Sequence, residues 1–131
     1  MVDLFAGVCV GDYAAARAWY EQLLGSEPSF VAHDTECVWE LDAHRFLFIV
    51  EDAERAGHAV LTIFIDDFDA LGNEIASRGI EPAKCETYSN GVRKATYRAP
   101  TATRSATAER RRRTRLSKGC SAGRSRELAH A

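Results

Sequence analysis

Histidine and cysteine side chains are the groups in this chain best suited to bind a metal or to attack a substrate, and the sequence holds four of each. The four cysteines form no CxxC pair, so neither a zinc site nor a disulfide framework is indicated and buried free thiols are expected. Cys9 has no histidine placed to activate it as a nucleophile. His58, with Glu51 as its candidate partner, is the one weak metal ligand, and a histidine in a turn at a strand entry is the favoured interpretation because one histidine rarely makes a site.

A second set of residues is suited to hold a small molecule by apolar contact. Strand alternation places these side chains on the inner sides of two strands, where aromatic rings would stack on a flat or hydrophobic ligand. The predicted ligand-binding residues are Phe5, Cys9, Trp39, Phe48, Thr62 and Phe64, with Phe46 completing the aromatic lining. The alternative is that they are core residues, because a small domain must fill its interior.

A repeated strand-helix pattern positions these residues. Leu4–Val10 is an apolar run that predicts a strand, Asp12 is a helix N-cap, and Gly25 ends the helix. Val60–Ile65, Asp67 and Gly79 repeat the same order about 55 residues later. Such caps and glycines are common in any two strand-helix units, which is the alternative to a true duplication.

The remaining strand candidates set the fold class. Residues 29–32, 37–41 and 45–50 predict three strands after the first helix, and residues 84–87 and 92–98 predict two after the second. The order is βαβββ followed by βαββ, so the second unit lacks its last strand. We expect an α+β domain over residues 1–98, with one module at about residues 1–55 and the other at about 56–98. Helices outside a curved mixed sheet would leave a cup for a ligand.

The charge of the chain is unevenly distributed. Residues 1–98 carry a formal net charge of −9 and residues 99–131 carry +7. An acidic body repels phosphate backbones, so nucleic-acid binding would depend on the tail alone.

The chain also contains no apolar run long enough to span a bilayer and no signal-peptide pattern at its start, which predicts a cytoplasmic protein without membrane contact.

The pattern resembles the vicinal oxygen chelate superfamily of glyoxalases, extradiol dioxygenases and bleomycin resistance proteins. The matching pieces are Val10-Gly11-Asp12-Tyr13, Trp19-Tyr20, Leu24-Gly25, Ile65-Asp66-Asp67, Asp69-Ala70 and Tyr97-Arg98. The resemblance implies paired βαβββ modules, a homodimer and, in the enzymes, a divalent ion held by His or Glu on inner strand positions. Here those positions fall on Phe5 and Val60, which cannot bind a metal, so no metal cofactor is expected.

The resemblance stops after Arg98. Family members continue with a sequence like Asp-Pro-Asp-Gly-Asn, whereas this chain has Ala99-Pro100-Thr101-Ala102-Thr103 and no apolar period. Restoring one base in the first of these codons permits the family residues at every position, so we interpret residues 99–131 as a frameshifted, basic, disordered tail. The alternative is a native tail whose arginines, Arg110–Arg113 and Arg115, bind acidic partners.

Three functions follow from the sequence. The first is a metal-independent protein that binds a small organic molecule, as antibiotic-sequestering relatives do. The second is a metal-dependent lyase or dioxygenase of the same superfamily with displaced ligands. The third is an interaction protein that acts through its arginine-rich tail. Whether the chain is an enzyme is left open, because fold does not specify chemistry.

Overall fold

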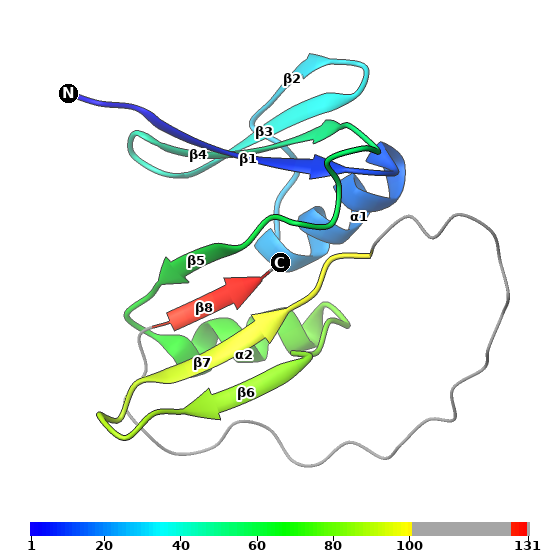
Figure 1. The fold of residues 1–131 in the computed structure, drawn as a ribbon. Coiled ribbons are helices and arrows are strands. Elements are labelled where there is room, and N and C mark those ends of the chain that lie inside the picture. Colours follow the sequence, from blue (N-terminus) through cyan, green and yellow to red (C-terminus); the bar gives the residue numbers. More distant parts are fainter. Residues whose placement is uncertain (101–126, 131) are drawn as a thin grey trace, which may run out of the picture.

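The computed structural model describes residues 1–100 in full and the backbone of residues 127–130; residues 101–126 and 131 are not described. The first unit contains β1 (Leu4–Val10), α1 (Tyr13–Leu24), β2 (Phe30–His33), β3 (Glu36–Asp42) and β4 (Arg45–Glu51). The second contains β5 (Leu61–Phe64), α2 (Phe68–Ser77), β6 (Lys84–Thr87), β7 (Arg93–Tyr97) and β8 (Glu127–His130). Figure 1 shows two four-stranded sheets with the two helices beside each other, which confirms the α+β class.

Both helices begin at the predicted aspartates. An Asp12 side-chain oxygen accepts a hydrogen bond from the Ala15 N–H at 3.1 Å, and Asp67 accepts one from the Ala70 N–H at 3.0 Å. Each bond satisfies an N–H group that has no partner within the first helical turn. Gly25 ends α1 with a φ of 76°, in the left-handed region where glycine is favoured.

The core of each unit lies between its helix and one face of its sheet. Ala16, Tyr20 and Leu23 are the buried residues of α1, and they pack in one cluster with Leu47 and Ile49 of the first sheet. Their spacing of three and four residues places them on one face of the helix. In the second unit, Phe68 and Ile75 of α2 pack in the same cluster with Ala95 and Tyr97 of β7. Since burial of apolar surface is the main favourable term in folding, these clusters hold each helix on its sheet.

Arg78 joins the two units. Its guanidinium donates hydrogen bonds to the carbonyl oxygens of Gln22 and Leu23, the second of them at 2.9 Å. These carbonyls lie in the last turn of α1, which has no basic residue of its own. A cation at this position satisfies carbonyls that lack helical partners and interacts favourably with the helix dipole. The end of α2 is therefore fixed against the end of α1.

The expectation that the second unit lacks its last strand is wrong. β8 lies between β5 and β7 and completes a sheet of order β5-β8-β7-β6. The physical reason is that β5 and β7 would otherwise present unpaired N–H and C=O groups, which favour pairing with any available strand. The disorder of the tail stays a prediction, because residues 101–126 and 131 lie outside the described residues.

β8 runs opposite to the corresponding strand of the first unit. β4 is parallel to β1 and antiparallel to β3, whereas β8 is antiparallel to β5 and parallel to β7. A tight turn at residues 42–45 joins β3 to β4 and requires the antiparallel arrangement. Residues 98–126 separate β7 from β8, and a connection of that length permits the parallel one.

No helix in the described part of the chain is long and apolar enough to cross a membrane.

Candidate ligand-binding site

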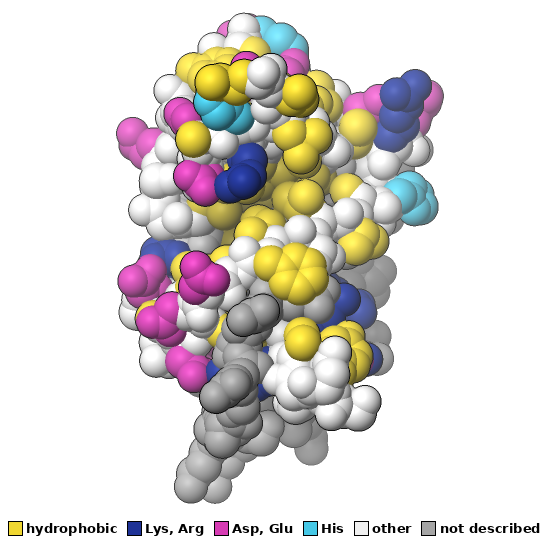
Figure 2. Space-filling view, turned by 90° about the vertical axis from the view of Figure 1, so that its left-hand side faces the viewer, with side chains coloured by type: hydrophobic (Ala, Val, Ile, Leu, Met, Phe, Trp, Pro, Cys, Tyr) yellow, Lys and Arg dark blue, Asp and Glu magenta, His cyan; other side chains and the backbone are white. Residues whose placement is uncertain are grey.

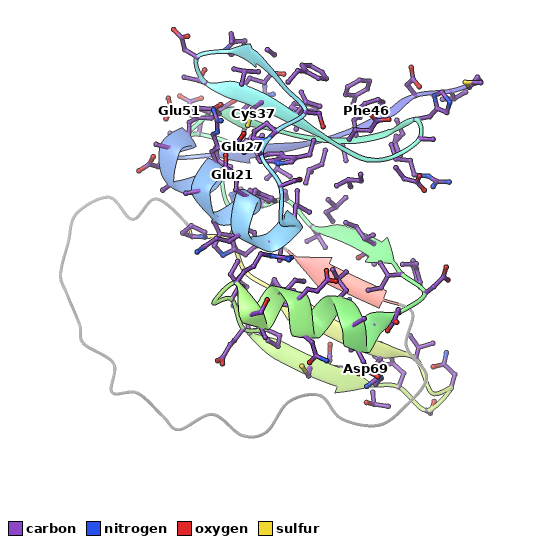
Figure 3. The ribbon with its side chains drawn as sticks, turned by 180° about the vertical axis from the view of Figure 1, so that it is seen from behind. Glu21, Glu27, Cys37, Phe46, Glu51 and Asp69 are labelled. Carbon is purple, nitrogen blue, oxygen red and sulfur yellow. The ribbon has the colours of Figure 1, made fainter. Side chains whose placement is uncertain are left out.

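An aromatic layer covers the face of the first sheet that is turned away from α1. The Phe5 and Phe46 rings are stacked, with centroids 4.4 Å apart and planes 10° apart. The Phe48 ring lies directly over Gly7, where a Cβ atom would come within 2.4 Å of the Phe48 Cζ. Figure 3 shows Phe46 on this side of the sheet, opposite α1. Phe5 is 48% exposed, so the layer is accessible to a ligand or a partner.

Trp39 is separate from this layer, and the expectation that it lines the same face as Phe48 is wrong. It pairs with Leu47 in the β3–β4 register, which places it on the helix side of the sheet. Its side chain is 1% exposed, and its Nε1–H donates to the Ser26 carbonyl oxygen at 3.1 Å. The Trp39 ring centroid lies 5.7 Å from that of Tyr20 on α1. Trp39 is therefore a core residue that borders a smaller cavity of about 220 Å³.

Thr62 and Phe64 lie on β5, in the other sheet, and are also turned away from their helix. Both are exposed, Phe64 by 68%, while their neighbours Leu61 and Ile63 are half-buried. The structure thus brings Phe5, Phe46 and Phe48 together and places Thr62 and Phe64 apart from them. Hydrophobic side chains gather in a hollow between the two halves of the molecule on the face drawn in Figure 2.

A cavity in the described part of the chain lies between the two units. It has a volume of about 550 Å³ and is lined by residues 8–11 at the end of β1, by Tyr20 of α1, by Ala56, Gly57 and Ala59, and by Thr96 and residues 98–100. Clefts of roughly 300–1,000 Å³ are typical of sites for small organic ligands. Most of its lining is apolar, and its polar side chains are those of Cys9, Tyr20, Thr96 and Arg98. Of the predicted ligand-binding residues, only Cys9 lines this cavity.

A solved structure of a glyoxalase/bleomycin resistance protein from Catenulispora acidiphila DSM 44928 is similar to this chain. The two share 45% sequence identity with a TM-score of 0.77, and the match covers 99% of this chain and 96% of the other. The chain belongs to the glyoxalase/bleomycin resistance protein family. The resemblance drawn from the sequence is thereby confirmed. No protein-family model matches the chain, and a comparison with curated proteins gives no match.

The residues that the structure describes do not fit the divalent ion of the family's enzymes. No three His, Cys, Asp or Glu side chains come together in a metal-binding cluster within the described residues. His58 is exposed, and a Glu51 carboxylate oxygen accepts a hydrogen bond from the Tyr13 N–H at 3.2 Å, at the start of α1. His33 and His44 form surface pairs with Glu36 and Asp3. We therefore assign no chemical step to a metal in this family member.

Two buried titratable groups, Tyr20 in the cavity wall and Cys37 in the core of the first unit, have raised pKa values. Burial raises the pKa of the Tyr20 phenol to about 12, so its hydroxyl is neutral at physiological pH. Cys37 is buried beneath the first sheet near Glu21 and Arg17, and burial raises the pKa of its thiol. A protonated thiol is a poor nucleophile.

Cys9 and Cys37 are free thiols as expected, but Cys85 is disulfide-bonded, which corrects the free-thiol prediction for that residue.

Sequence reasoning missed Thr96 and Arg98 as cavity residues. Alternation along β7 predicts that they share a face, and this signal was available in the sequence. Their place beside Cys9 depends on how the two units pack, and no local pattern specifies a contact between residues so distant in the chain. The same holds for Gly57, which enters the cavity wall from the connection between β4 and β5.

Proposed function

We propose that this member of the glyoxalase/bleomycin resistance protein family binds a small organic molecule and does so without the divalent metal of the family's enzymes. The observation that carries the proposal is the apolar cavity of about 550 Å³ between the two units. Family membership supports a ligand-binding role, and the poor fit of the donor residues to a metal supports sequestration rather than metal-assisted catalysis. The aromatic layer that contains Phe5 and Phe48 is a second apolar surface, on the first sheet.

A ligand screen with two matched variants tests the proposal. Thermal unfolding of the full chain would be followed with a panel of hydrophobic and aromatic compounds, since a ligand that binds only the folded state raises Tm. Ala59→Leu adds bulk to the cavity wall, and Ala53→Leu makes the same change at an exposed position. We expect the Tm increase in the native chain and in Ala53→Leu, and its loss in Ala59→Leu.

Metal analysis of the same preparation separates this function from the enzyme alternative. Binding that persists after treatment with a chelator supports a metal-independent site. A stoichiometric divalent ion in the purified protein, lost together with ligand binding on chelation or on His58→Ala, would contradict it. A Tm increase of equal size in Ala59→Leu and Ala53→Leu would show that the cavity is not the binding site.

We further propose that the chain functions as a homodimer in which the aromatic layer is covered by a second copy. Phe5 is 48% exposed although its ring is stacked on Phe46, and exposed large apolar side chains gathered in one patch mark interaction sites. Sedimentation should report a dimer for the native chain and a shift toward monomer for Phe5→Gln. Tyr88→Gln, at a residue 42% exposed near the β6–β7 turn, is the control. A native monomer would contradict the proposal.

We also propose that residues from about Ala99 onward are a frameshifted reading, so that β8 is a substitute for the family's last strand. The reversed direction of β8 relative to β4 supports this, because duplicated units built from native sequence would share one strand direction. Restoring the frame should raise the melting temperature. An intact reading frame in independent clones of the gene, or a restored form that is no more stable, would contradict the frameshift.

A further inference from the structure

The cavity between the two units carries positive charge, although residues 1–98 are acidic overall. Arg98 is the one charged side chain among the described residues that line it. We propose that the ligand carries a carboxylate or similar anionic group that pairs with the Arg98 guanidinium, with an apolar body against the rest of the wall. This inference rests on the proposed ligand-binding function and names the class of its ligand.

Arg98 differs from the other arginines of residues 1–100 in having no carboxylate or carbonyl partner among the described residues. Arg17, Arg45, Arg55 and Arg93 each pair with a carboxylate within 4 Å, and Arg78 donates to two carbonyl oxygens. Within residues 1–100, no carboxylate oxygen lies within 4 Å of the Arg98 side-chain nitrogens. The guanidinium therefore has its hydrogen-bond donors available for a bound anion.

The surroundings of Arg98 are basic although the body of the chain is acidic. Residues 1–98 carry a net charge of −9, yet Lys84, Lys94, Thr96 and Arg98 follow one another on the inner face of the β6–β7 pair. Among the described side chains of β6 and β7, Glu86 is the acid on this face, and it forms an ion pair with Lys84 at 2.8 Å. Glu127 of β8 pairs with Lys94 in the register of the sheet. Lys84 pairs with Thr96 in the β6–β7 register, so it lies on the same face as Arg98, two residues further along the chain from Thr96. Of these cations, Arg98 is the one that lines the cavity, and its positive charge favours an anionic ligand at this end.

The chemistry of the wall makes a carboxylate a good match. A guanidinium binds a carboxylate through two parallel N–H···O bonds, and such charge-assisted bonds are about twice as strong as neutral ones. Arg98 is exposed at the edge of the cavity, while Val10 and Ala59 give the apolar body of the ligand a wall to pack against. The Thr96 hydroxyl lies in the same wall and can donate a further hydrogen bond.

Two probes of equal shape test the inference by calorimetry on the full chain. Naphthalene-2-carboxylate is anionic at neutral pH, and naphthalene-2-carboxamide is its neutral counterpart. We expect the carboxylate to bind about tenfold more tightly to the native chain, which corresponds to one charge-assisted hydrogen-bond contribution. Arg98→Gln should abolish this preference and leave carboxamide binding unchanged, while Arg98→Lys should keep part of it. Salt should weaken carboxylate binding selectively.

Arg45→Gln is the matched control, because it removes one arginine charge at the opposite end of the β1–β4 pair from the cavity. It should leave the preference intact. Equal binding of both probes to the native chain, or a preference that survives Arg98→Gln, would overturn the inference while leaving the proposed function standing. If neither probe binds and the ligand screen also fails, the proposed function falls and the inference falls with it.

Discussion

The contact between Gly25 and Arg78 offers a strict test of how the two units are held together. An alanine Cβ at position 25 would lie 2.9 Å from the Arg78 Cζ, so the guanidinium would have to move. Alanine would also occupy a backbone with φ of 76°, which costs roughly 1–2 kcal/mol for an L-residue. Loss of the two Arg78 hydrogen bonds to α1 adds about 1–2 kcal/mol, a discounted value because these bonds are partly exposed. Gly25→Ala should therefore destabilise the chain by about 2–4 kcal/mol.

Gly91→Ala is the reference for the backbone cost alone. Gly91 has a φ of 85° and no heavy atom within 4 Å of an added Cβ. We expect this variant to lose only about 1–2 kcal/mol in urea denaturation. The decisive measurement is a double-mutant cycle with Arg78→Ala, in which Gly25→Ala should cost no more than Gly91→Ala. Additivity of the two single changes within about 0.5 kcal/mol would refute the reasoning, because residues in contact should show coupling.

The remaining predictions concern the aromatic layer and two titrating groups. Gly7→Ala should cost about 1–2 kcal/mol in urea denaturation by displacing the Phe48 ring, and Phe48→Leu should recover most of it; no recovery would contradict the contact. The free energy of unfolding should fall by about 2–3 kcal/mol between pH 10 and 12 on account of Tyr20. The reason is that the pKa of its phenol is near 10 in the unfolded chain and about 12 in the folded one. Tyr20→Phe should flatten this dependence on pH. The Arg93 guanidinium lowers the pKa of Asp69, so Asp69→Asn should destabilise at pH 7 and lose its effect as acid protonates the native carboxylate; an equal effect at pH 2 would exclude this pairing.

The elements of the fold were largely predictable because their signals are local. The cap aspartates Asp12 and Asp67 sit where free N–H groups require an acceptor, and both bonds form. Trp39 was assigned to the wrong face even though its neighbour Glu40 is charged and exposed. Successive side chains of a strand point to opposite faces, so an exposed Glu40 places Trp39 on the buried face, against α1.

The cavity could not be predicted, because it depends on the packing of one unit against the other. Cys9 and Thr96 each lie in a strand whose place in the sequence is clear, but their common wall forms only once α1 and α2 are fixed side by side. Arg78 holds the two helices together through its hydrogen bonds to the end of α1, and nothing in the sequence except its charge indicates this contact. Long-range contacts of this kind lie outside the reach of periodicity and capping rules.

The reversed strand β8 shows which part of the second unit is specified by side chains and which by backbone. α2 and β7 bury Phe68, Ile75, Ala95 and Tyr97 against one another, and these contacts do not involve the described backbone of β8. The position between β5 and β7 requires only a strand that supplies N–H and C=O groups to both neighbours, and a strand of either direction can do so. The contacts between α2 and β7 therefore account for the side-chain packing in the described part of the second unit.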